Sequence, residues 1–353
     1  MMGVEHIHNV MAVDGAVVTA VSDPHPASIE WARLAVGSSA DLAIFQDHND
    51  LLDSGLVDAV VIASPNFTHH QILLDALARP VHILMEKPLC TTLEQCRDVV
   101  EAAAESGHDR VVWMGLEYRY MPPTQRLLAE LDAGTVGDVK MVAIREHRFP
   151  FLPKVDNWNR FSRNTGGTLV EKTCHFFDLM LQITKARPVR VFASGGQSVN
   201  HLDERYDGET PDILDNAYVI VDFDDGSRGL LDLCMFAEAS VNEQEIVVTG
   251  DVGKIEALVT ESKLRVGKRA DGQHVVDTYD IHHEGIKHVG LHHGSSYLEH
   301  VDFAAAIRAG TEPAVTLMDG LRSAAIGFAA HRSIDSGLPV LMSDLDELDG
   351  LDW

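Results

Sequence analysis

The densest stretch of reactive side chains is NTGGTLVEKTCHFFDLM, in which Glu171 and His175 lie four positions apart. On a helix this spacing places both side chains on one face, and the apolar neighbours predict a mostly buried helix from about Leu169 to Gln182. Imidazole is the side chain whose pKa lies nearest neutrality, and a neighbouring carboxylate fixes its tautomer. The pair is therefore a candidate acid/base couple, and the alternative is an ordinary surface Glu–His pair.

A second candidate, Lys87, follows an apolar predicted strand in the segment HILMEKPL, directly after Glu86. Pro88 comes next, so the Lys87–Pro88 bond can be cis. A lysine at this place could hold a substrate hydroxyl or relay a proton, with its pKa lowered by partial burial. The residue types also allow a plain solvated lysine at a strand end.

Two more predicted strands end in polar residues. Asp23 ends AVVTAVSD; in the second strand of a Rossmann unit such a carboxylate binds the adenosine ribose and repels a 2′-phosphate, which favours NAD over NADP. The alternative is a turn or helix-cap aspartate. The turn Ser64-Pro65-Asn66 follows VDAVVIA and precedes a helix whose N-terminal amides suit an anionic or carbonyl ligand, or are merely capped.

The fold must bring these side chains together, and the sequence of residues 1–118 predicts an α/β Rossmann domain. Short β-branched runs alternate with helical patterns there, which is typical of βαβ units around a parallel sheet. DAVVIA is the continuous apolar run of a strand buried on both faces. Ligands of such sheets bind at the carboxyl ends of the strands, where Asp23, Asn66 and Lys87 are expected.

Residues 119–353 predict an α+β domain for substrate binding and oligomerisation. Strands dominate this region, in NAYVIVDFDDGSRGLLDLCMF and QEIVVTGDVGKIEAL among others, and their Asp-Gly and Gly-Asp turns indicate antiparallel hairpins. The expected result is a large, mostly antiparallel sheet. Two helices, Tyr297–Ala309 and Gly320–Ser336, close the chain, and the segment from about residue 297 is expected to pack back on the first domain.

Composition excludes several classes of protein. The 353 residues exceed one ordinary core, and a net charge of −26 disfavours nucleic acid and anionic membranes. No apolar run has membrane length and no leader is visible, so a cytoplasmic protein is expected. Four cysteines without a C-x-x-C spacing fit a reducing compartment. The 19 histidines form no H-E-x-x-H frame, so no metal is expected.

Taken together and in this order, the motifs resemble the Gfo/Idh/MocA family of NAD(P)-dependent oxidoreductases, which includes inositol dehydrogenases. EKPL is similar to that family's E-K-P signature, ASPNFTHH to its Pro-Asn…His turn, EYRYMP to its Tyr-Arg-aromatic segment, and GGTLVEKTCHFFD to its G-G-x-L-x-D-x-G-x-H-x-x-D. The likeness covers nearly the whole chain, including the C-terminal helices.

The resemblance implies roles for individual residues. Lys87 would contact the nicotinamide ribose and the substrate, and His175 would be the acid/base. Glu171 stands where the family has aspartate, and its extra methylene alters the reach of the carboxylate. The implied cofactor-binding residues come from the strand ends and the first helix: Gly3, Asp23, Ser64, Pro65, Asn66, His69, Glu86 and Lys87.

The segment DNWNRFSRN offers a stacking face and hydrogen-bond donors suited to a polyhydroxylated ring. Together with the Tyr-Arg segment it supplies the candidate substrate-binding residues: Tyr118, Arg119, Asn157, Trp158, Arg160, Arg163 and Asn164. The expected activity is NAD-linked oxidation of a secondary alcohol on a sugar, cyclitol or related polyol, in a homodimer or homotetramer formed through the C-terminal sheet. The alternatives are a non-catalytic sensor that binds dinucleotide and sugar, or a truncated inactive form.

The first residues, MMGVEHIHNV, read as a helix that begins beside Gly3. In a Rossmann fold the third glycine of G-x-G-x-x-G packs the first helix against the first strand, and Gly3 matches that position. The expectation is that this strand and the two earlier glycines lie upstream of Met1, and that a chain without them binds dinucleotide poorly.

Overall fold

The computed structural model describes residues 2–37, 41–107 and 109–351, and the chain divides into two compact units. The first unit combines N-terminal segments with a late one: Met1–Cys90, Glu94–Tyr120 and Gly285–Leu321. The second unit holds the remainder: Thr91–Leu93, Met121–Glu284 and Arg322–Trp353. We describe each unit by itself.

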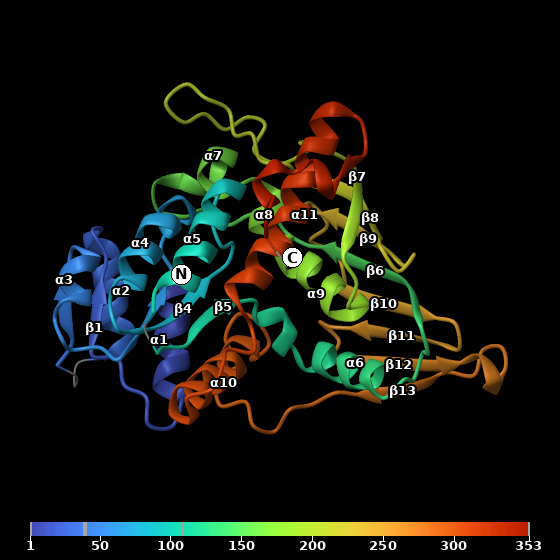
Figure 1. Cartoon of the computed structure of the whole chain (residues 1–353), viewed down its shortest axis with the longest axis horizontal. Helices are drawn as coiled ribbons and strands as arrows, with labels where there is room; N and C mark the ends of the chain where they lie inside the picture. Colours follow the sequence, from blue (N-terminus) through green and yellow to red (C-terminus); the bar gives the residue numbers. More distant parts are fainter. Residues whose placement is uncertain (1, 38–40, 108, 352–353) are drawn as a thin grey trace. The chain divides into compact units, whose positions relative to one another are not determined.

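Helices and short strands alternate in the first unit (Figure 1). Its helices are α1 (Met2–Ala12), α2 (Pro26–Val36), α3 (His48–Leu52), α4 (His69–Leu77), α5 (Leu93–Glu105) and the later α10 (Ser295–Ala309). Its strands are β1 (Ala20–Ser22), β2 (Ala43–Phe45), β3 (Ala59–Ile62), β4 (His82–Glu86) and β5 (Val112–Gly115).

The strands of the first unit are all parallel, but they form two ladders. One ladder pairs β1 with β2, and the other has the order β3-β4-β5. Within the described ranges no ladder joins β1 to β3. The strand expected from Ala16 to Asp23 is correspondingly short: only β1 pairs, and Val17 is exposed. The central strand β4 is the most buried, as a continuous apolar run predicts.

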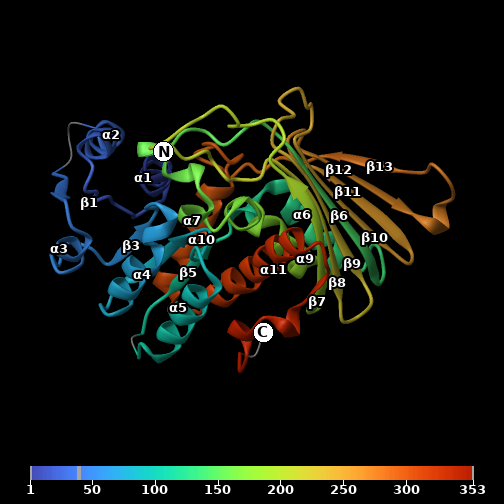
Figure 2. The same ribbon diagram turned by 90° about the horizontal axis from the view of Figure 1, so that it is seen from above.

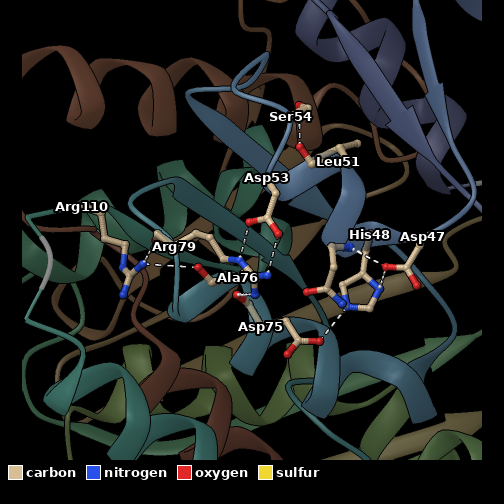
Figure 3. Close-up of polar contacts among 10 residues, drawn as sticks. Asp47, His48, Leu51, Asp53, Ser54, Asp75, Ala76, Arg79 and Arg110 are labelled. Atoms are coloured by element: carbon tan, nitrogen blue, oxygen red, sulfur yellow. Dashed lines mark hydrogen bonds and ion pairs between the residues drawn. The ribbon is translucent and has the colours of Figure 1, made fainter.

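A cluster of polar side chains connects α3 to α4 in this unit (Figure 3). Arg79 donates two hydrogen bonds to the Asp53 carboxylate, from Nε at 3.1 Å and from Nη2 at 3.2 Å. His48 Nε2 lies 2.7 Å from Asp75 Oδ2. Arg110 donates to backbone carbonyls at the end of α4. The bidentate geometry is the strongest form of this ion pair. The cluster thus holds α4, which begins at the turn after β3.

The second unit is built on one large sheet. Its strands are β6 (Val139–His147), β7 (Pro188–Gly196), β8 (Asn216–Phe223), β9 (Arg228–Cys234), β10 (Gln244–Gly250), β11 (Gly253–Leu258), β12 (Lys263–Lys268), β13 (Asp277–Asp280) and β14 (Val340–Leu341). Its helices are α6 (Pro122–Asp132), α7 (Ser162–Thr165), α8 (Thr168–Glu171) and α9 (Cys174–Thr184), and most of α11 (Leu317–Ser336) belongs to it.

The nine strands have the order β13-β12-β11-β10-β6-β9-β8-β7-β14, and every neighbouring pair is antiparallel except β6 with β9. The predicted hairpins β8–β9 and β10–β11 are confirmed, whereas β12 and β13 were not foreseen. Helices α6 and α9 pack on one face, and in Figure 2 no helix of the described residues covers the other. Together the two units confirm the predicted fold class.

The predicted single helix from Leu169 to Gln182 is wrong: the segment forms two helices, α8 and α9. The Thr173 hydroxyl donates to the carbonyl of Leu169 at 2.7 Å, and the Thr173 carbonyl accepts from Phe177 at the start of α9. Such local bonds between a threonine side chain and the backbone compete with a continuous helix. No helix in the described ranges is long and apolar enough to cross a membrane.

Candidate active site

The turn after β4 carries the first candidate pair, Glu86 and Lys87. Glu86 is buried; its Oε1 lies 2.8 Å from His6 Nε2, and its Oε2 accepts the Lys87 backbone N–H at 3.0 Å. Burial raises the pKa of Glu86, but the hydrogen bond and charge of His6 and the charge of Lys87 outweigh it and hold that pKa at about 2. The Lys87–Pro88 bond is cis. The strand end thus presents Lys87 beside an ionised carboxylate.

His69 ties the turn after β3 to the turn after β4. Its Nδ1 lies 2.8 Å from the carbonyl of Pro88 and its Nε2 lies 3.0 Å from the carbonyl of Ser64. Burial lowers the pKa of His69, so the neutral ring donates to one carbonyl at a time. Both ring nitrogens are used inside the protein, and His69 therefore positions the two turns rather than presenting a donor to a ligand.

Ser64, Pro65 and Asn66 form the start of a short 3₁₀ turn, Asn66–Thr68, before α4. The Thr68 hydroxyl lies 2.8 Å from Ser64 Oγ and 2.7 Å from the Pro65 carbonyl. These contacts close the turn locally, and the Asn66 side chain is buried within it.

Asp23 follows β1, and its Oδ1 accepts the backbone N–H of His25 at 2.8 Å. This bond is that of a turn aspartate, and it uses one of the two carboxylate oxygens. Gly3 lies in the first turn of α1, where an added Cβ would meet no atom within 4 Å. No described residue therefore packs closely against Gly3.

Tyr118 and Arg119 lie in a 3₁₀ turn, Glu117–Tyr120, directly after β5. Tyr118 is buried, with its ring 6.2 Å from that of His292. Arg119 Nη2 lies 3.3 Å from Asp319 Oδ1, within the same unit. The Arg119 side chain therefore braces the start of α11.

Glu171 and His175 lie in the second unit, at the end of α8 and in the first turn of α9. Both side chains are buried. Lys172 between them turns toward the sheet, where its Nζ lies 2.9 Å from Glu146 Oε1. The break between α8 and α9 therefore brings an acid and an imidazole into one buried turn and directs the lysine to another partner.

The segment 157–164 is mostly occupied by its own interactions. Arg160 is 3 % exposed, and its Nε lies 3.0 Å from Glu204 Oε2. Arg163 lies over the ring of Phe161 at 4.2 Å and pairs with Glu209. A buried guanidinium held by a carboxylate is a structural element of this loop. The geometry therefore does not support the expectation that Arg160 faces a substrate.

Three more predicted substrate residues lie in the same segment. The Asn164 side-chain amide donates to the Trp158 carbonyl at 2.9 Å, which fixes the loop around Trp158. Asn157 has a positive φ of 53°, a conformation that asparagine tolerates better than most residues.

The polar groups at the strand ends of the first unit fit a dinucleotide. A carboxylate follows β1, a hydroxyl-bearing turn follows β3 and an ammonium follows β4, and groups of these kinds bind ribose hydroxyls and carbonyl or anionic groups. Within the described part of the chain no group of three or more His, Cys, Asp or Glu side chains could hold a metal ion.

Sequence reasoning missed three histidines that contact candidate site segments: His6, His300 and His331. Each meets its partner across a long sequence separation, as with His300 and His6 or His331 and Leu169. A local sequence pattern does not predict contacts between residues so far apart in the chain. The sequence could indicate only that these three histidines occupy helix positions expected to be buried.

One unit with a parallel sheet and charged strand ends, and a second unit with a broad sheet and a buried Glu–His turn, are the parts expected of a dinucleotide-linked oxidoreductase. The chain belongs to the Gfo/Idh/MocA oxidoreductase family: residues 1–115 match its model "Oxidoreductase family, NAD-binding Rossmann fold", and residues 129–342 match "Oxidoreductase family, C-terminal alpha/beta domain". The resemblance inferred from the motifs is thereby confirmed, and so is NAD as the cofactor class of the first domain.

Curated relatives span almost the full chain. Myo-inositol 2-dehydrogenase of Thermotoga maritima is 26% identical over 349 residues, which cover 98% of this chain and 96% of the relative. The scyllo-inositol 2-dehydrogenase (NAD(+)) of Bacillus subtilis is also 26% identical, over 96% of this chain and 93% of the relative.

Among solved structures, levoglucosan dehydrogenase in complex with NADH and levoglucosan has a TM-score of 0.83 at 20% identity, covering 97% of this chain and 96% of that one. At this identity the likeness shows the shared fold.

Proposed function

We propose that the protein is an NAD-dependent dehydrogenase that oxidises a secondary alcohol of a cyclitol, sugar or related polyol. The observation that carries the proposal is the buried Glu171–His175 turn, which matches in position the acid/base segment of the family, together with Lys87 at the end of β4. The names of the curated relatives support a polyol as the substrate class.

In the proposed reaction the alcohol loses a hydride from carbon and a proton from oxygen, and becomes a ketone. Bound nicotinamide supplies the hydride acceptor. His175 is the base that takes the hydroxyl proton as the C–H bond breaks, and Lys87 donates a hydrogen bond to the substrate. Glu171 accepts hydrogen bonds from substrate hydroxyls. Asp23, the turn at Ser64 and the Glu86–Lys87 strand end hold the dinucleotide.

The test is a spectrophotometric assay of NADH formation with a panel of inositol isomers and sugars. Turnover of at least one polyol is expected, with a loss of about 100-fold or more in kcat in Lys87→Ala and His175→Ala. Lys185→Ala is the matched control, because Lys185 is exposed and pairs with Asp132 at the surface. The proposal fails if no polyol is turned over or if both site variants retain parental rates; dinucleotide binding without turnover would identify a sensor instead.

We also propose that the chain forms a homodimer or homotetramer through the helix-free face of the nine-stranded sheet. Apolar side chains on β8 point to solvent, including Tyr218 at 62% and Ile220 at 44% exposure. Ion pairs lie on either side of them: Arg145–Glu245 joins β6 to β10, and Arg190–Asp222 joins β7 to β8. An exposed apolar patch bordered by charged side chains is a common composition of a protein–protein interface.

A further inference from the structure

Three buried side chains of the first unit form a hydrogen-bonded chain that ends on the backbone of Lys87. His300 Nδ1 lies 2.7 Å from the Ser296 carbonyl, His300 Nε2 lies 3.2 Å from His6 Nδ1, and His6 Nε2 lies 2.8 Å from Glu86 Oε1. The other carboxylate oxygen of Glu86 accepts the Lys87 N–H. His6, Glu86 and His300 are each at most 4% exposed, so water does not compete for these bonds.

The acceptor at one end sets the direction of every proton in the chain. A carbonyl only accepts, so His300 Nδ1 carries a proton and donates to Ser296. Burial is the main cause and the charge of His6 the second cause that lower the pKa of His300 to about 3. The His300 Nε2 therefore carries a lone pair and no proton. His6 Nδ1 must then donate to it. One further proton lies between His6 Nε2 and Glu86 Oε1, so these two atoms also share a hydrogen bond.

Two further carboxyl groups lie near this chain of hydrogen bonds. Glu299 on α10 is buried, and its pKa is raised well above the usual range by burial and by the charges of Glu117 and Glu86. Glu117 lies 3.8 Å from His292. Glu86 is the carboxyl group of the three that His6 contacts.

The amide of Lys87 is the last backbone donor before Pro88, which has none. A carboxylate that accepts this amide in a charge-assisted bond orients the peptide from which the Lys87 side chain extends. Because Glu86 is buried, its orientation depends on the donor at its other oxygen.

We propose that His6 is a positioning residue for Lys87: it holds the Glu86 carboxylate in the orientation that accepts the Lys87 amide, and His300, by bonding to the other ring nitrogen, fixes the orientation of the His6 ring. The consequence for catalysis rests on the proposed function, whereas the backbone contact does not. His6 itself touches neither substrate nor reacting atoms in this scheme.

The experiment compares His6→Leu, which removes the donor, with His6→Gln, whose amide can still donate to Glu86. His8→Gln is the matched control on the same helix, where the half-buried native ring lies 5.5 Å from the ring of His288. Amide hydrogen exchange of the peptide containing Lys87 and steady-state kinetics with NAD and the preferred polyol are the two readouts.

His6→Leu is expected to speed exchange at the Lys87 amide about tenfold or more and to lower kcat about ten- to a hundredfold. KM for NAD should change much less. His6→Gln should bring the exchange rate of the Lys87 amide and kcat most of the way back to the parental values. His8→Gln should match the parent in both. If His6→Leu does not fold, His6→Asn serves instead, since it can bond to His300 but is too short for Glu86.

Unchanged exchange at Lys87 and unchanged kcat in the His6 variant would overturn the proposal. A uniform rise in exchange across the first unit, with no rescue by glutamine, would show a role in overall stability only and would also overturn it. If the parent turns over no polyol while exchange at Lys87 alone rises in His6→Leu, the proposed function fails and the positioning role stands.

Discussion

His331 Nε2 accepts a hydrogen bond from the backbone N–H of Leu169 at 3.1 Å. Leu169 lies in the first turn of α8, where helix amides have no partner within the helix. The residue at the cap position, Gly167, has no side chain to accept them, and an added Cβ there would overlap the His331 ring. A side chain of α11 thus caps the short helix that ends in Glu171, and the cap requires a neutral imidazole.

Replacing His331 should therefore weaken the fold around Glu171. His331→Leu leaves the Leu169 amide without its acceptor, and we expect the free energy of unfolding to fall by about 1–2 kcal/mol. His331→Gln keeps an acceptor of similar reach and should lose less than half of that. Urea denaturation of the two variants and the parent measures the difference; equal losses in both would show that ring packing, not the hydrogen bond, matters.

The same histidine predicts a dependence of stability on pH. Burial lowers the pKa of His331 to about 4, below the ordinary value near 6.5. Between these values the unfolded chain binds a proton that the folded chain does not, so stability present above about pH 6.5 is lost as pH falls to about 4. His300 acts in the same direction, with a pKa of about 3, while Glu299 opposes it because its pKa is raised.

Denaturation at several pH values from 7 to 4 checks this prediction. His331→Gln should reduce the slope of unfolding free energy against pH by up to about 1.4 kcal/mol per pH unit in that window. Arg163→Gln, at an exposed surface pair, is the control and should leave the slope unchanged. A His331→Gln slope identical to the parent's would contradict a neutral buried imidazole.

The sequence predicted the parts of the fold that depend on local pattern. Hydrophobic period and turn residues located α1, α10 and the hairpins of the second unit to within a few residues, since these elements are specified by near neighbours. The break between α8 and α9 was missed because Thr173 bonds to the backbone instead of continuing the helix. Strand β12 was missed because its alternation of buried and exposed residues is only six residues long.

The candidate site was predictable in its motifs but not in its supporting contacts. Glu86, Lys87, Glu171 and His175 were found from the sequence because family motifs carry them. The partners that orient these segments come from remote helices, as His6 does for Glu86. Arg160 likewise has a remote partner that the sequence did not reveal, because its Nε lies 3.0 Å from Glu204 Oε2.

A buried ion pair beside the candidate site should be sensitive to loss of one partner. Lys172 and Glu146 are both buried, and Arg148 approaches Glu146 only to 3.6 Å. Lys172→Met leaves a buried carboxylate without its cation, which costs about 3–5 kcal/mol of stability. The double variant Lys172→Met/Glu146→Leu should recover most of the lost stability. Thermal and urea unfolding measure the stability of both variants. A small loss in Lys172→Met alone would show that Arg148 replaces Lys172 as the cation that pairs with Glu146.

The charge of Asp23 should set the preference between cofactors. Asp23→Asn keeps the side-chain oxygen that accepts the His25 amide but removes the negative charge that repels a 2′-phosphate. We expect the ratio of kcat/KM for NAD to that for NADP to fall about tenfold or more. Asp47→Asn, at the cap of α3, controls for a general effect on the unit. An unchanged ratio would remove Asp23 from the ribose site.

The helix-free face of the sheet should determine the oligomeric state. Ile220 lies on β8 at 44% exposure, so an arginine there would place a charge in the apolar patch of an interface between copies. We expect Ile220→Arg to shift the protein to monomers in analytical ultracentrifugation at micromolar concentration, because a charge desolvated without a partner is strongly unfavourable. Leu34→Arg is the control, since Leu34 is 78% exposed on α2 in the other unit. Equal sedimentation of Ile220→Arg and the parent would place any interface elsewhere, while dissociation by Leu34→Arg alone would locate it on the first unit.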